Sequence, residues 1–116
     1  MKVAKVGNVY KVARITGPQH NFLGLVLCEE AMTLPIIERL EIDQKHSRSG
    51  LLDEDEVLAA VQQGIAEANQ KFDTHFYLAL LQYVPTDTPD LAVYSVLARQ
   101  IVAQAWMDIS PEVSRH

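Results

Sequence analysis

The chain has 116 residues, of which 48% are hydrophobic and 22% are charged, and it carries a formal net charge of -5. This composition is typical of one folded domain, here residues 1–116, and is far from the low hydrophobicity and high charge of a disordered chain. Affinity for nucleic acids comes largely from Lys and Arg that displace counterions from phosphates, so the acidic balance makes a nucleic-acid partner unlikely on electrostatic grounds.

The start of the chain contains no apolar stretch of signal-peptide length, and no window approaches the roughly 18 apolar residues of a membrane helix. We therefore expect a cytoplasmic location and no membrane partner. Cys28 is the only cysteine, which excludes an internal disulfide and a cysteine-based zinc site.

The first half of the chain predicts three strands. Residues 9–15 mix β-branched and polar side chains, residues 16–21 have turn chemistry, and residues 22–27 form an apolar run, which together indicate a hairpin with a longer loop. Residues 36–43 alternate apolar and charged side chains, a pattern typical of a half-exposed antiparallel strand.

A helix and a strand follow. Asp53 is placed to cap a helix, and apolar residues recur from Val57 to Phe72 at spacings of one, three and four, which is one stripe of an amphipathic helix. Residues 76–84 are apolar at both parities and carry no charge, so they predict a central strand.

The last element is a second helix. Thr88 and Pro89 are placed to begin it, since a Thr cap and the fixed φ of Pro at the first helical position both favour a helix start. We expect the helix to end near Trp106 or Met107. The predicted core contains apolar residues of both helices and of the fourth strand: Val61, Ile65, Leu78, Leu80, Leu97 and Ile101.

The order of these elements predicts the fold class. Three strands, a helix, a strand and a helix (β-β-β-α-β-α) form an α+β domain with a four-stranded mixed sheet and two helices packed on one face. The other face of the sheet then stays partly open. We expect a protein partner, or self-association as a homodimer, to cover it.

Several motifs in the second half carry a resemblance to a known family: Val57-x-x-x-Val61-x-x-Gly64-Ile65-x-Glu67-Ala68, Asp87-Thr88, Tyr94 and Ala98. With the element order, they resemble domain IV of elongation factor G, within the ribosomal protein S5 domain 2-like fold. The resemblance implies that fold, and it raises the alternative of a ribosome- or RNA-associated factor. The tip loops that translocases use against RNA are not matched, and a G-x-x-x-x-G-K-[ST] phosphate loop is absent.

One loop stands out as a ligand-binding candidate. Residues 45–50 combine basic and hydroxyl side chains, among them His46, Arg48 and Ser49, just before a helix N-terminus that attracts anions. The acidic run of residues 53–56 would occupy the same positive helix end and repel a phosphate. The competing interpretation of residues 45–50 is therefore a solvated loop without a ligand.

No pattern predicts catalysis, a metal or a cofactor. The four histidines lack metal-ligand spacing, and the serines lack a nucleophile elbow. Carboxylates near positions 53–56 and 87–90 are explained by helix starts. We therefore predict no catalytic residue, no metal and no cofactor.

The absence of these motifs, together with the net acidity, favours a non-enzymatic protein-binding module, of the kind found in immunity or antitoxin proteins. Glu54 and Asp55 are the predicted protein-binding residues, because exposed carboxylates steer a basic partner. The alternatives are a small-ligand-binding domain or minor enzyme that uses residues 45–50, and the ribosome- or RNA-associated factor.

Overall fold

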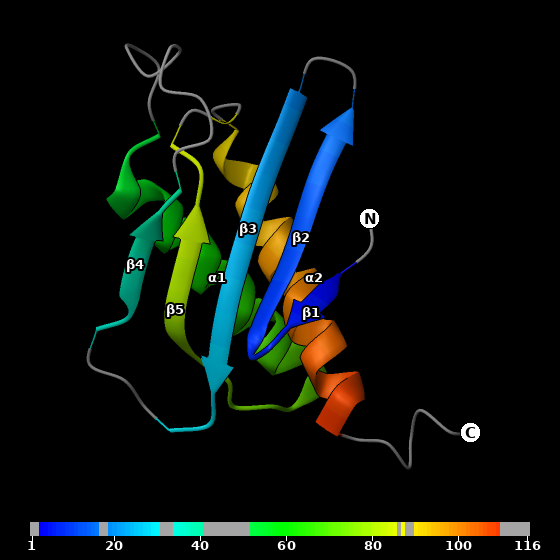
Figure 1. The fold of residues 1–116 in the computed structure, drawn as a ribbon. Helices are drawn as coiled ribbons and strands as arrows, with labels where there is room; N and C mark the ends of the chain where they lie inside the picture. Colours follow the sequence, from blue (N-terminus) through cyan, green and yellow to red (C-terminus); the bar gives the residue numbers. More distant parts are fainter. Residues whose placement is uncertain are drawn as a thin grey trace.

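The structure, a computed structural model, describes residues 3–16, 19–30, 34–40, 52–85, 87 and 90–109. One layer is a five-stranded sheet and the other is a pair of helices, which both cover the same face of the sheet (Figure 1). The α+β class and the placement of both helices are confirmed. The predicted four strands are one too few, because the short strand β1 (Ala4–Val6) adds to the edge of the sheet.

The strands lie in the order β1-β2-β3-β5-β4. β2 (Val9–Thr16) and β3 (Gln19–Cys28) form the predicted antiparallel hairpin, and they pair as far as Thr16 and Gln19. The connection is therefore tighter than the loop expected over residues 16–21.

Two further strands follow β3 across the sheet. They are β5 (Tyr77–Tyr83), a central strand, and β4 (Ile36–Arg39), an edge strand. β5 lies between β3 and β4, as its continuous apolar sequence indicated. β4 pairs with β5 in parallel, so the antiparallel direction expected for the strand over 36–43 was wrong, and residues 41–43 lie outside the described residues. Alternation of apolar and charged residues indicates a half-exposed strand. A parallel edge strand can show the same alternation as an antiparallel one, so the pattern does not give the direction.

Two helices, α1 (Glu54–Phe72) and α2 (Leu91–Ile109), complete the fold. Asp53 caps α1 as predicted, since its Oδ1 accepts the Asp55 N–H at 2.8 Å. α2 begins at Leu91 and runs past the expected end near 106, while Thr88 and Pro89 lie outside the described residues.

The connection β4–α1–β5 has an unusual hand. In Figure 1 both strands run upward, β5 is to the right of β4, and α1 lies behind the sheet, so the crossover is left-handed. About 98% of such connections are right-handed. This topology keeps α1 on the same side of the sheet as α2, so that neither of the two described helices lies on the opposite side.

The core lies between the helices and the inward side chains of β2, β3 and β5. Five of the six predicted core residues are buried, and the exception is Leu80. A register shift opposite Val26 and Leu27 places Leu78 inward and Leu80 outward, although both have the same parity in the sequence. A β-bulge of this kind changes which residues face the core, and a sequence pattern does not reveal it.

Candidate functional site

A polar cluster lies where the β2–β3 hairpin meets the connection from β5 to α2. The Asp87 carboxylate is buried, with the residue only 2% exposed, and it accepts the Phe22 N–H at 2.7 Å. The same carboxylate lies 3.2 Å from Nδ1 of His20, whose side chain is 62% exposed. A carboxylate held in this way orients the imidazole.

A second group of contacts ties the hairpin to the start of α2. Asn21 is buried and donates from Nδ2 to the Tyr94 hydroxyl at 3.1 Å. Arg14 donates to Oδ1 of Asn21 at 2.7 Å and also lies 3.5 Å from Oδ2 of Asp90. These contacts satisfy polar groups that would be costly to bury alone.

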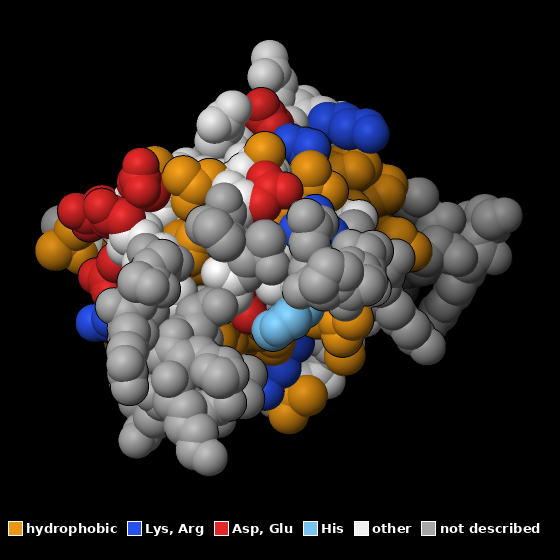
Figure 2. Space-filling view, turned by 90° about the horizontal axis from the view of Figure 1, so that it is seen from above, with side chains coloured by type: hydrophobic (Ala, Val, Ile, Leu, Met, Phe, Trp, Pro, Cys, Tyr) orange, Lys and Arg blue, Asp and Glu red, His pale blue; other side chains and the backbone are white. Residues whose placement is uncertain are grey.

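Burial dominates the electrostatics of the cluster. It raises the pKa of Asp87 above its usual value, although the Phe22 N–H and His20 oppose the shift. Burial also raises the pKa of Tyr94 to about 12, so its phenol stays protonated at neutral pH. Figure 2, which looks down on this end of the molecule, shows a histidine with acidic and basic side chains nearby.

The predicted ligand-binding residues His46, Arg48 and Ser49 lie outside the described residues. The residues that flank them are at the same end of the sheet as the polar cluster: the Leu40 N–H donates to the Tyr83 carbonyl, and the Leu52 N–H donates to the Pro85 carbonyl. The sequence did not indicate His20 and Asp87 as a pair, because 67 positions of chain separate residues whose contact depends on the sheet order.

Glu54 and Asp55 occupy the first turn of α1, where Glu54 is partly buried and Asp55 is exposed. Their carboxylates lie at the positive end of the helix dipole, which stabilises the helix whether or not a partner binds. Figure 2 shows acidic side chains gathered on the side of the molecule where α1 begins.

The uncovered side of the sheet, here called the open face, is a second candidate site. Its side chains alternate with the buried ones along β2 and β3, and apolar residues of all five strands contribute to it: Val6, Val9, Ile15, Phe22, Val26, Leu80 and Ile36. Ile15, Ile36 and Val6 are 76%, 61% and 60% exposed. An apolar surface of this kind marks a site of protein contact more often than a solvated face.

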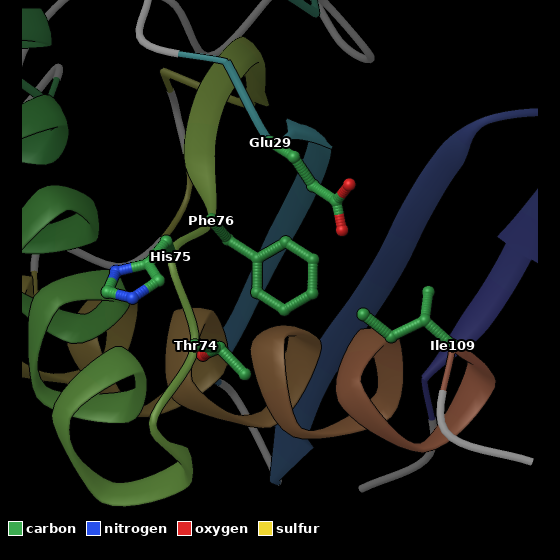
Figure 3. Close-up of a pocket in the computed structure, with 5 residues that line it drawn as sticks. All are labelled: Glu29, Thr74, His75, Phe76 and Ile109. Atoms are coloured by element: carbon green, nitrogen blue, oxygen red, sulfur yellow. The ribbon is translucent and has the colours of Figure 1, made fainter.

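A hollow of about 360 Å³ lies at the opposite end of the molecule, lined by Glu29, Thr74, His75, Phe76 and Ile109. In Figure 3 the Phe76 ring, Glu29 and Ile109 surround one space, while the His75 ring points away to the other side of the strand. The lining therefore offers one carboxylate over an apolar floor, without a second polar group aimed at the same point.

Comparisons with known proteins identify no relative of this chain: no family model, no curated protein and no solved structure matches it. Within the described ranges, no group of three His, Cys, Asp or Glu side chains is arranged to hold a metal ion. Neither described helix combines the length and the apolar content that a membrane-spanning helix needs.

Proposed function

We propose that the chain is a non-enzymatic protein-binding module that contacts its partner through the open face of the sheet. The observation that carries this proposal is the one-sided packing: both helices cover one face, and apolar side chains occupy the other. Removing apolar surface from water gains about 25 cal/mol per Å², so covering this face stabilises an assembly.

The chemistry of the face specifies its occupant. Ile36, Leu80 and Val26 lie side by side on β4, β5 and β3, and one cation, Lys11, and one anion, Glu38, lie on the same face nearer its two edges. The partner is therefore a protein surface with an apolar centre and a charge of each sign near its margins. Nucleic acids and lipid headgroups do not offer this combination.

The acidic balance supports steering of that partner. Glu54 and Asp55 belong to a first helical turn with three consecutive carboxylates, beside the sheet edge that β4 forms. Charges near the rim of an interface accelerate association more than they strengthen the final complex. This division of roles, with an apolar contact and acidic steering, matches the immunity or antitoxin-like profile inferred from the sequence.

Capture from an extract of the native host, followed by mass spectrometry, tests the proposal. Ile36→Lys places a charge in the centre of the face and should abolish stoichiometric capture of the protein partner. Met107→Lys is the matched control, because Met107 is also an exposed apolar residue but lies on α2. Equal capture by wild type and Ile36→Lys would contradict the proposed contact surface.

The steering residues are tested separately by association kinetics with the captured partner. Asp55→Ala should slow association and reduce its salt dependence, with a smaller effect on dissociation, because exposed charges are screened beyond about 8 Å at physiological ionic strength. An unchanged association rate would remove Asp55 from the binding surface, and Glu54→Ala tests Glu54 in the same way.

A second candidate function, small-ligand binding or a minor enzymatic activity, is favoured by the His20–Asp87 pair. The pair lies at the carboxyl end of β5, beside the residues that flank the segment with His46 and Arg48. A screen of small anions by thermal shift, with His20→Ala as comparison, tests it. The ribosome- or RNA-associated alternative stays a prediction from resemblance, and the net charge of -5 opposes it.

A further inference from the structure

Two neighbouring rows of residues cross the open face. The first row contains Lys11 on β2, Gly24 on β3, Gln82 on β5 and Glu38 on β4, paired in register. The row therefore begins with a positive charge, ends with a negative charge and has no charge between them.

Neither charge in this row forms an ion pair with another described residue. Lys11 makes no ion pair with the part of the chain that the structure describes. Glu38 accepts a hydrogen bond from Nε2 of Gln82 at 2.7 Å, while Oε1 of Gln82 is buried without a donor among the described residues. The cation at one end of the row and the anion at the other leave the row ready for a complementary surface.

The second row is apolar throughout. Val26 pairs with Leu80 and Leu80 pairs with Ile36, while Val9 continues the row on β2, beside Val6. A surface that matches both rows must present an apolar band next to a band with one charge of each sign. The open face itself has this pattern.

From this self-complementarity we infer that the partner on the open face is a second copy of this chain, packed sheet against sheet. In a two-fold dimer, each contact between residue i and residue j occurs twice. An axis parallel to the strands, between β3 and β5, places Lys11 opposite the partner's Glu38 and Gly24 opposite the partner's Gln82. The same axis places Val26 opposite the partner's Leu80.

The charges also oppose the other simple two-fold arrangement. An axis in the interface but perpendicular to the strands, running along the first row, would place each strand on its own copy, so that like charges would meet at Lys11 and at Glu38. Stacked sheets lie about 10 Å apart, a distance that a Lys and a Glu side chain span together. The arrangement deepens the proposed function, because it rests on the open face being a protein contact.

Sedimentation equilibrium of purified protein tests the inference. The wild type should be a dimer, and Lys11→Glu and Glu38→Lys should each raise the dimer dissociation constant by about tenfold or more, because a two-fold interface contains every altered pair twice. An equimolar mixture of the two variants should dimerise as the wild type does, since each introduced charge then meets an opposite one.

Lys71→Glu serves as control, because it makes the same charge change on the outer surface of α1 and should leave the dimer intact. Circular dichroism and thermal melting establish that the variants fold. A monomeric wild type, or a mixture that fails to dimerise although both variants are folded, would overturn the inference.

The proposed function can stand when this inference fails. If the wild type is monomeric and Ile36→Lys still abolishes capture of a different host protein, the open face binds a protein other than its own copy. If the wild type is monomeric and Ile36→Lys also leaves capture unchanged, both the second copy and the open face are excluded as the contact.

Discussion

The two faces of the sheet are similar in sequence but differ in environment. On the covered face, Leu23, Leu25 and Leu81 are completely buried beneath the helices. On the open face, Val26 and Leu80 are equally apolar, yet they are only partly buried. The apolar character of a strand therefore does not say what covers each of its sides, and a face left uncovered in the isolated chain indicates a further contact.

The covered face depends on a close approach of the two helices. Gly64 of α1 lies against Ser95 and Ala98 of α2, where an added Cβ would come within 2.9 Å of the Ala98 Cβ. Ser95 donates from its hydroxyl to the Ala60 carbonyl at 2.9 Å across the same contact. Both helices thus act as one layer, and this layer is large enough to cover one face only.

Leu97→Ala should cause the largest loss of stability, about 2–5 kcal/mol, because it leaves a cavity between α2 and the rest of the core. Urea denaturation measures the loss, with Met107→Ala on the exposed side of α2 as control. A loss below about 1 kcal/mol would show that the helix layer does not hold the covered face as tightly as its burial indicates.

Gly64→Ala comes next and is expected to destabilise the fold by about 1–3 kcal/mol through overpacking, although alanine favours helices by about 1 kcal/mol over glycine. The direct reason is the missing space against Ser95 and Ala98. Ala66→Gly, at an exposed position of the same helix, measures the intrinsic propensity alone. A stabilised Gly64→Ala variant would mean that the helices can separate without cost.

Tyr94→Phe tests the polar part of the covered face, and a loss of about 1–2 kcal/mol is expected at neutral pH because Asn21 loses the acceptor of its Nδ2 donor. The loss should shrink at alkaline pH. Burial raises the pKa of Tyr94 from 10.0 to about 12, so its contribution is complete below pH 10 and declines as the pH rises through 12. The denaturation midpoints of the wild type and of Tyr94→Phe, measured from neutral pH up to this alkaline range, test the effect. A difference between the two midpoints that stays constant with pH would contradict it.

The smallest effect is expected for Leu80→Ala, at about 1 kcal/mol or less in the monomer, because the side chain is only partly buried on the open face. Leu78→Ala is the matched comparison, two residues away but facing the core, and should cost about 2–5 kcal/mol. Both are measured in a Lys11→Glu background to remove the contribution of self-association. Equal losses would mean that the bulge does not separate the two side chains.

Much of the fold was predictable because it depends on local chemistry. The Asp53 cap, the apolar stripe of α1 and the uncharged strand β5 each follow from a few neighbouring residues, and the structure confirms all three. The strand count failed at β1, whose three residues are all exposed and carry no burial pattern. The orientation of Leu80 failed because a bulge shifts parity without a sequence signal.

The candidate sites were less accessible to prediction, and the reason is the length of chain that separates their parts. His20 and Asp87 meet only because the hairpin and the connection after β5 lie at the same end of the sheet. The row from Lys11 to Glu38 exists only through three separate strand pairings. By itself the sequence determined the types and order of the elements from residue 9 onward and the Asp53 cap, since these depend on propensities and hydrogen bonds over a few residues. Only the tertiary structure decided the left-handed crossover, the inward and outward sides of β5, and the charge pattern of the open face, because each arises from pairing between distant segments.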